Sequence, residues 1–170
     1  MKVFIGGSRK IAKLNQEIKN RIDNIIKNDF IILIGDANGV DRSIQQYLFS
    51  QNYKNVYIFC VNNECRNNVG SWTVKRIQSN HPKKDYKYYS SKDIQMAKET
   101  DFGFMIWDGE SRGTLNNIIN LLMQNKKVLV YFSPEKNFYD IKTFADLNSI
   151  NLKYRDLSSI MGSNLFPELQ

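Results

Sequence analysis

Six of the nine glycines fall in three short segments that also carry charged and hydroxyl side chains. The segments span residues 6–9, 35–41 and 108–114 and read GGSR, GDANGVD and DGESRGT. Glycines at the start of a helix let a phosphate approach the backbone N–H groups, and arginine and hydroxyl groups add charge-assisted hydrogen bonds. Carboxylates accept hydrogen bonds from ribose hydroxyls. Together the three segments predict a site for a phosphorylated ribose.

The candidate ligand-binding residues in these segments divide by chemistry into phosphate ligands and ribose ligands. Those in the three segments are Gly7, Ser8, Arg9, Asp36, Asn38, Gly39, Asp41, Asp108, Ser111, Arg112, Gly113 and Thr114. Aromatic rings that could stack on a base are Trp72 and the group Tyr86, Tyr88 and Tyr89. Purely structural roles compete with these assignments. Asp36 is also a common turn former, Asp41 suits the first turn of any helix, and buried aromatic rings usually pack in cores.

Strands and helices alternate along the chain and would position these segments. Short apolar runs predict buried strands at 2–5, 30–34, 56–60, 102–107 and 128–132. Apolar residues recur every three to four positions over 11–26, 40–48 and from Gly113 onward, which predicts amphipathic helices. Such alternation is typical of an α/β, Rossmann-like three-layer sandwich with a mainly parallel sheet. Each glycine segment then lies at the carboxyl edge of the sheet, where ligands bind in such folds.

Two stretches give weaker patterns. Residues 61–90 are polar, and we expect a loop with a short helix over 71–79, followed by a helix over 91–100 capped by Ser91. We expect residues 1–132 to form the core and residues 133–170 a strand and helix appended to the same domain. The end of the chain, from Met161 onward, is expected to fray.

Length and composition bound the class of protein. A chain of 170 residues with 42% hydrophobic and 24% charged residues fits one globular domain. Its purely apolar runs, such as 30–34, are far too short to cross a membrane, so we expect a cytoplasmic protein without a membrane partner. Cys60 and Cys65 form no CxxC pair and are interpreted as reduced thiols. With His81 as the single histidine, a histidine triad or multi-histidine metal centre is nearly excluded.

The net charge of +7 by itself indicates a polyanionic partner. The lysines that dominate it are dispersed, however, and scattered lysines usually serve solubility. Nucleic acid is therefore the less favoured partner. The sequence also lacks the lysine of GxxxxGK[ST] and a complete GxGxxG, which argues against a P-loop ATPase and a dinucleotide dehydrogenase. A magnesium ion on Asp36 and Asp108 is a minority alternative, and we expect no cofactor.

In their order and positions, the motifs FIGGSR, GDANGVD and WDGESRGT resemble the SLOG superfamily of Rossmann-like domains, which includes DprA-type and LOG-type proteins. The resemblance covers about residues 1–132 and is greatest to small stand-alone members. It implies a site for a nucleotide or nucleotide-derived ligand and a homo-oligomer. In LOG-type phosphoribohydrolases the motif PGGxGTxxE ends in a catalytic glutamate, and the corresponding position here is Asn117. An amide cannot act as a general base, so we expect Asn117 to bind ligand without that hydrolysis.

Three functions follow from these patterns. The leading hypothesis is a protein that binds an ADP-ribose-type or cyclic signalling nucleotide and sequesters it without turnover, as a sponge for an antiviral signal would. The second is an N-glycosidic hydrolase or transferase that uses Asp36, Asp108 or Glu110. The third is a DprA-like binder of single-stranded DNA, which predicts a steep dependence of affinity on salt.

Overall fold

A seven-stranded sheet runs through the part of the chain that the computed structural model describes, residues 1–151. The strand order is β4-β3-β2-β1-β5-β6-β7, and all pairs are parallel except β6 with β7. The strands are β1 (Lys2–Gly7), β2 (Ile31–Gly35), β3 (Val56–Val61), β4 (Thr73–Ile77), β5 (Phe102–Trp107), β6 (Val128–Phe132) and β7 (Asn137–Ile141).

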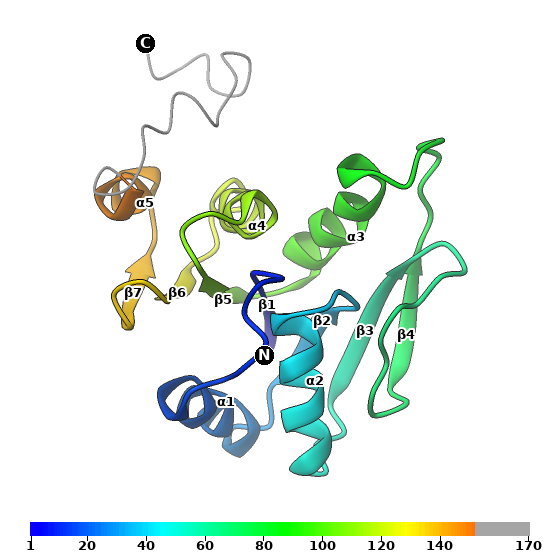
Figure 1. The fold of residues 1–170 in the computed structure, drawn as a ribbon, viewed down its shortest axis with the longest axis horizontal. Helices are drawn as coiled ribbons and strands as arrows, with labels where there is room; N and C mark the ends of the chain where they lie inside the picture. Colours follow the sequence, from blue (N-terminus) through cyan, green and yellow to red (C-terminus); the bar gives the residue numbers. More distant parts are fainter. Residues whose placement is uncertain (152–170) are drawn as a thin grey trace.

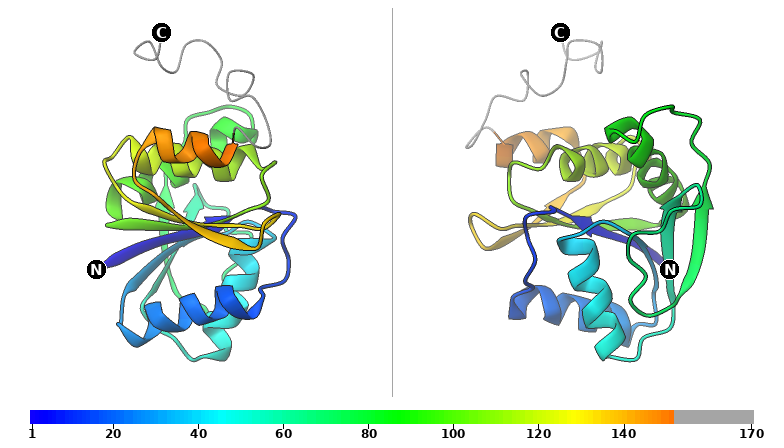
Figure 2. Two further views of the ribbon diagram at one scale, coloured as in Figure 1. Left: turned by 90° about the vertical axis from the view of Figure 1, so that its left-hand side faces the viewer. Right: turned by 45° about the vertical axis from the view of Figure 1, so that its right-hand side comes forward.

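Helices cover both faces of this sheet, so the molecule has three layers (Figures 1 and 2). The first two helices pack on one face and the other three on the opposite face. The helices are α1 (Gln16–Lys27), α2 (Val40–Ser50), α3 (Tyr86–Glu99), α4 (Arg112–Leu122) and α5 (Phe144–Asn151). The predicted α/β, Rossmann-like three-layer sandwich with a mainly parallel sheet is confirmed.

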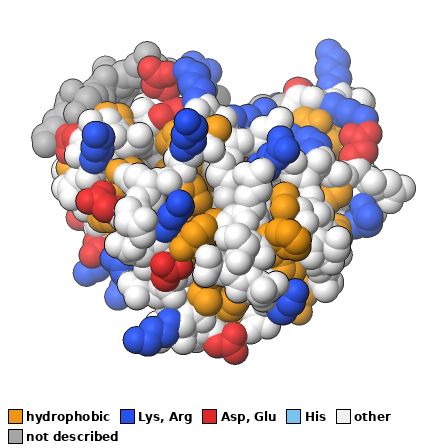
Figure 3. All heavy atoms as spheres, turned by 60° about the horizontal axis from the view of Figure 1, so that its bottom comes forward, with side chains coloured by type: hydrophobic (Ala, Val, Ile, Leu, Met, Phe, Trp, Pro, Cys, Tyr) orange, Lys and Arg blue, Asp and Glu red, His pale blue; other side chains and the backbone are white. Residues whose placement is uncertain are grey.

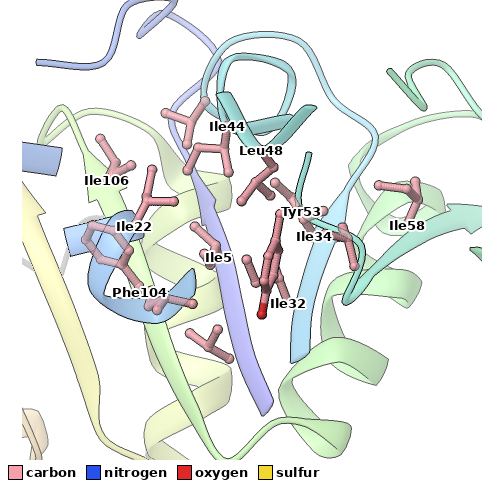
Figure 4. Packing of buried hydrophobic residues seen from close by; sticks show 14 of the residues in the cluster. Ile5, Ile22, Ile32, Ile34, Ile44, Leu48, Tyr53, Ile58, Phe104 and Ile106 are labelled. Atoms are coloured by element: carbon pink, nitrogen blue, oxygen red, sulfur yellow. The ribbon is translucent and has the colours of Figure 1, made fainter. Parts of the chain in front are cut away.

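Two apolar cores, one on each face of the sheet, hold the layers together. Under α1 and α2, isoleucines from the central strands interlock with Ile22, Ile44 and Leu48 of the helices (Figure 4). On the other face, Phe4, Leu33 and strand β5 pack against α3 and α4. The stripe expected on the helix after Gly113 belongs to this second core, because its members are all buried: Leu115, Ile118, Ile119 and Leu122.

The structure corrects the assignment of residues 71–90. Residues 73–77 form the edge strand β4 and not part of a helix, because they pair with β3 and keep an extended backbone. Helix α3 begins at Tyr86, five residues before the predicted start, because Asp85 accepts hydrogen bonds from two N–H groups of the first turn and caps it. Ser91 is therefore an internal residue of the helix. Its hydroxyl bonds the Tyr88 carbonyl and caps nothing.

Cys60 and Cys65 are also not the free thiols that were expected. The structure joins them in a disulfide. A tight turn at the end of β3 causes this, because Val61 forms a bridge with Glu64 and folds the chain back on itself. The bond fixes the start of the loop that leads from β3 to β4.

The described part of the C-terminal region adds β7 to the edge of the sheet and packs α5 against the same core through Leu147 and Ile150. The expectation for Met161 onward lies outside the described residues. No described helix is long and apolar enough to cross a membrane. In Figure 3, which shows the side toward the bottom of Figure 1, lysines and arginines are spread singly among polar and apolar groups.

Candidate functional site

The carboxyl ends of β1, β2 and β5 border a cavity of about 710 Å³, which extends to the first turns of α3 and α4. The residues predicted from sequence that line it are Gly7, Arg9, Asp41, Asp108, Ser111, Gly113, Thr114 and Asn117. Segments that are up to 110 residues apart in sequence thus share one cavity, as the glycine-segment argument expected. The cavity is also lined by residues that the sequence did not single out, above all from α3.

The amino-terminal turn of α4 forms one wall. Ser111 is its N-cap, and its side-chain oxygen accepts a hydrogen bond from the Thr114 N–H at 3.3 Å and from the Thr114 hydroxyl at 3.0 Å. Both residues and Gly113 line the cavity. The N–H groups and partial positive charge of a helix start, beside two hydroxyls, make this wall suitable for a phosphate. Arg112 is exposed and does not line the cavity.

Ser8 lies behind this wall and joins two of the loops. Its hydroxyl accepts a hydrogen bond from the Asp108 N–H at 3.1 Å and lies 3.3 Å from the Thr114 hydroxyl. Its own N–H bonds the Ile106 carbonyl at 3.0 Å. Ser8 is fully buried, so it positions the wall and does not itself face the cavity.

Gly39 and Asn38 shape the second loop without lining the cavity. Gly39 has a φ of +78°, and a Cβ there would lie 2.3 Å from the carbonyl oxygen of Arg9. Only glycine permits this approach, which brings the loop after β2 against the loop after β1. Asn38 is exposed, and its side-chain oxygen accepts a hydrogen bond from Asn67.

The loop carboxylates near the mouth are already engaged. Asp108 accepts hydrogen bonds from the N–H groups of Glu110 and Ser111, at 3.0 and 2.8 Å, which holds the turn before α4. Glu110 forms an exposed ion pair with Lys10 at 2.7 Å, and this pair links the first and third loops at the rim. The hydrogen bond that Lys10 donates to Glu110 raises the pKa of Lys10.

Asp36 lies beneath the cavity and not in its lining. Its carboxylate is 2% exposed and accepts three hydrogen bonds from Arg66, from the backbone N–H, Nε and Nη2, at 3.0, 3.2 and 2.6 Å. Burial favours the protonated acid, but Arg66 and Lys92 outweigh it and lower the pKa of Asp36 below its ordinary value. Asp36 therefore fixes Arg66, which does line the cavity.

Aromatic contact comes from α3 and not from Trp72. Trp72 is buried in the core on the α1 and α2 face, where its indole N–H bonds the Tyr53 carbonyl at 2.9 Å. It does not line the cavity. Tyr89 does, with the Arg66 guanidinium 4.3 Å from its ring centroid. The ring of Tyr88 meets Tyr89 edge to face at 5.1 Å.

Helix α3 also brings a buried lysine to the cavity. The Lys92 side chain is 4% exposed, and its Nζ lies 2.7 Å from Asp93 and 3.9 Å from Asp36. Burial alone would lower the pKa of Lys92, but Asp93, Asp41 and Asp36 raise it above its ordinary value. The protonated form of Lys92 is therefore favoured, and in that form its nitrogen has no lone pair for nucleophilic attack.

Three carboxylates surround Lys92. Within residues 1–151, Asp36 and Asp93 each form a hydrogen bond with a cation, and Asp41 forms none. It lies over the ends of β1 and β2, where Gly6 and Gly35 leave room: a Cβ on Gly35 would be 2.5 Å from its Oδ2. Oδ2 accepts a hydrogen bond from the Ala37 N–H at 3.2 Å. Burial raises the pKa of Asp41 to about 7.

Asn117 faces the cavity from the second turn of α4. It is 9% exposed, yet its side-chain amide makes no hydrogen bond to any residue in the described part of the chain. Buried amides in native proteins are almost always hydrogen-bonded, so an unsatisfied one that lines a cavity is explained by a ligand or by solvent.

Sequence reasoning missed Lys92, Asp93 and Arg66, whereas Tyr89 was among the aromatic residues it named. One signal was present for Lys92: it lies four residues after Tyr88 and four before Met96, and so on the buried stripe of the helix. A lysine on an apolar stripe indicates a buried partner. No comparable signal marked Arg66, because its contacts depend on how a polar loop folds back over Asp36.

The set of described side chains that comes nearest to metal-ligand spacing is Asp36 with Cys60 and Cys65, whose candidate atoms lie within 4.8 Å of one another. The two sulfurs are bonded to each other and the carboxylate to Arg66, so this set does not suit a metal. Asp36 and Asp108, the alternative pair for magnesium, do not both line the cavity.

Comparison with known proteins adds no relative: no family model and no curated protein matches the chain.

Proposed function

We propose that the protein binds a nucleotide-derived ligand, of the ADP-ribose or cyclic signalling type, at the carboxyl edge of its sheet and holds it without turnover. The observation that carries the proposal is the convergence of three glycine segments and the first turn of α4 on one cavity of about 710 Å³. The volume lies in the range of pockets that bury small organic ligands. The resemblance to the SLOG superfamily supports the same ligand class.

The charges on the walls also support this ligand class. The start of α4 offers hydroxyls and N–H groups, and Arg9 and Lys10 add positive charge at the rim. Arg66 and Tyr89 present a flat cation and an aromatic ring, both of which stack on nucleobases in other proteins. A phosphate, a sugar and a base would therefore each meet side chains of suitable chemistry.

Capture and turnover are separated by one experiment. Purified protein is incubated with ADP-ribose, cyclic ADP-ribose or adenosine 5′-monophosphate, separated from free ligand, heated, and the released molecule is analysed by mass spectrometry. Unaltered ligand supports capture. A cleaved product refutes capture without turnover, and failure to retain any of these ligands refutes the proposed function.

The carboxylates of the cavity support a second candidate, an N-glycosidic hydrolase or transferase. Asp108 and Glu110 line the cavity, whereas Asp36, the third residue considered, does not. An acid beside the sugar could stabilise an oxocarbenium-like centre or protonate a leaving base. Base release that disappears in Asp108→Ala or Glu110→Ala, with retained ligand binding, would establish this activity.

The remaining parts of the proposal concern the oligomeric state and the cellular location of the protein. We infer a homo-oligomer in the cytoplasm, on the resemblance to superfamily members that pair through helices beside the sheet. Light scattering coupled to size-exclusion chromatography tests the subunit number, and a monomer at micromolar concentration would contradict it.

A further inference from the structure

We propose that Asp41 and Asn117 together bind a pair of neighbouring hydroxyl groups on the sugar of the ligand, so that the site selects ribose over 2-deoxyribose. The inference rests on the proposed function and specifies it. It assigns the inner part of the cavity to the sugar, and it makes two residues that are far apart in sequence the determinants of sugar specificity.

Asn117 and Asp41 both have polar atoms that form no hydrogen bond within the described residues. The Asn117 amide has two donor hydrogens and an acceptor oxygen, and none of them is bonded within residues 1–151. Asp41 is 7% exposed, and its Oδ2 accepts a hydrogen bond from the Ala37 N–H, whereas its Oδ1 accepts no hydrogen bond from the described residues. Both side chains line the same cavity. A buried group left unsatisfied is costly, so the ligand is expected to satisfy both.

Charge decides which kind of group fits between them. A second phosphate is disfavoured because the carboxyl groups of Asp41 and Asp93 both line this end of the cavity. A cation is disfavoured because the Lys92 ammonium already occupies this end, 2.7 Å from Asp93. The group that remains is neutral and donates hydrogen bonds to Asp41 while exchanging them with an amide. Hydroxyl groups both donate and accept, and so meet this requirement.

Position along α4 favours the sugar over the base. Asn117 lies three and four residues after Thr114 and Gly113, which places it about 5 Å farther along the helix from the proposed phosphate wall. That span is comparable to the separation between a 5′-phosphate and the hydroxyls of its own ribose, whereas the Watson–Crick edge of the base lies farther from that phosphate. The base would then extend toward Tyr89 and Arg66.

Two glycines at the strand ends, Gly6 and Gly35, leave the space in which the Asp41 side chain lies. A Cβ on Gly6 would lie 3.7 Å from Asp41 Oδ1, and a Cβ on Gly35 would lie 2.7 Å from Lys92 Nζ. Two strand ends without side chains therefore leave the space that these charged groups occupy. Phe4, whose ring lies 3.3 Å from the same Gly6 position, closes the floor with apolar surface. Fixed groups in a dry setting discriminate more sharply than mobile surface groups.

The test compares adenosine 5′-monophosphate with its 2′-deoxy and 3′-deoxy forms by calorimetry. We expect each missing hydroxyl to weaken binding about 10- to 100-fold, as is usual when a buried partner loses its hydrogen bond. Asn117→Leu and Asp41→Asn should reduce the ratio of ribose to deoxyribose affinity toward one. Asn120→Leu, on the same helix but outside the cavity lining, should leave the ratio unchanged.

The outcomes separate the two proposals. Equal affinity for the ribose and deoxyribose forms, with binding still sensitive to Ser111→Ala, would overturn the inference and leave the proposed function standing. Discrimination among bases that is lost in Asn117→Leu would place the base at this end and also overturn it. Absence of binding by all three nucleotides would overturn both. A misfolded variant lowers every affinity equally, so the ratio identifies the specific effect.

Discussion

The ion pair between Asp36 and Arg66 is central to the architecture of the site. A carboxylate that is 2% exposed is stable there because one arginine supplies three hydrogen bonds. The same bonds hold the guanidinium against the Tyr89 ring at the edge of the cavity. One ion pair thus supports the fold and the wall of the site together.

Replacing Arg66 by glutamine should therefore destabilise the protein by about 2–4 kcal/mol at pH 7, because it leaves a buried charge without its partner. Chemical denaturation measures this difference. Because the pKa of Asp36 is lowered in the fold, its stabilising contribution is present above its unfolded value of 3.8 and is lost as the pH falls below it. The defect should accordingly shrink at pH 3.

The exposed pair of Lys84 and Glu64 provides the matched control. Lys84→Gln should leave the midpoint of denaturation unchanged, since exposed pairs contribute little. Asp36→Asn added to Arg66→Gln should restore part of the lost stability. If the double variant is as unstable as the single one, the unpaired charge is not the cause.

Asp41 predicts the opposite dependence on pH. Burial raises its pKa from 3.8 to about 7, so the folded protein holds this proton more tightly than the unfolded chain does. Stability is then lost as the pH rises from 3.8 to about 7, because the unfolded chain releases this proton while the folded protein retains it. Asp41→Asn should raise the free energy of unfolding by about 1–3 kcal/mol more at pH 8 than at pH 5, as measured by urea denaturation.

A gain of equal size at both pH values would contradict this assignment. The groups that face Asp41 are Lys92, Asp93, Asp36 and Arg66, and the substitution leaves all of them in place.

Among the elements, the first turn of α4 joins stability to binding. Gly113 adopts a helical conformation there, and a Cβ would meet nothing closer than the Ser111 hydroxyl at 4.0 Å. Gly113→Ala should therefore increase the free energy of unfolding by about 0.5–1 kcal/mol, because alanine favours helix. The same methyl group would stand in the cavity lining and weaken the binding of phosphate-bearing ligands.

Thermal denaturation and calorimetry measure these two effects on one variant. Gly39→Ala is the informative contrast, because a positive φ and a contact of 2.3 Å with Arg9 should make it destabilising. An increase in stability with unchanged phosphate affinity for Gly113→Ala would show that the phosphate does not approach this turn.

Strands and helices with a clear apolar sequence pattern were predictable. Those whose bounds depend on pairing with another strand or on a capping residue were not. Strands β5 and β6 begin and end where the apolar runs do, because a strand buried on both faces has few polar residues. Strand β4 escaped prediction because it lies at the sheet edge, where its half-buried lysine and exposed arginine break the pattern. Asp85 looked like part of a polar loop, since its role as a cap depends on the helix that follows.

The same distinction applies to the site. Glycines and their neighbours after strands could be placed at one edge from sequence alone, because parallel strands have their carboxyl ends together. The position of the α3 side chains in the cavity wall could not be predicted, since it depends on which way this helix packs across the sheet. Trp72 is the opposite case, a residue that was predicted to contact the ligand and does not. Its aromatic ring suited stacking on a base, but the indole packs in the core.

At the scale of the whole molecule, the charge of +7 does not form a continuous track on the surface that Figure 3 shows. Binding of a small ligand in the cavity should depend weakly on salt, because such a ligand carries only one or two phosphates. We expect the logarithm of affinity to fall with a slope of about 1–2 against the logarithm of salt concentration, which corresponds to one or two neutralised phosphates.

Calorimetry with adenosine 5′-monophosphate at 50–300 mM salt tests this slope, and fluorescence anisotropy with a single-stranded oligonucleotide provides the comparison. Tight oligonucleotide binding with a slope of five or more would favour the DprA-like alternative over a pocket ligand.

The central place of β1 has a consequence for how the chain folds as it is synthesised. The first strand made pairs on one side with β2, which follows closely, but its other neighbour is β5, about a hundred residues later. Until Trp107 has left the ribosome, β1 has a bare edge, and both the loop after β5 and the first turn of α4 are missing from the cavity. A nascent chain that stops before that point can form half a sheet but no binding site, so ligand capture would mark the synthesis of α4.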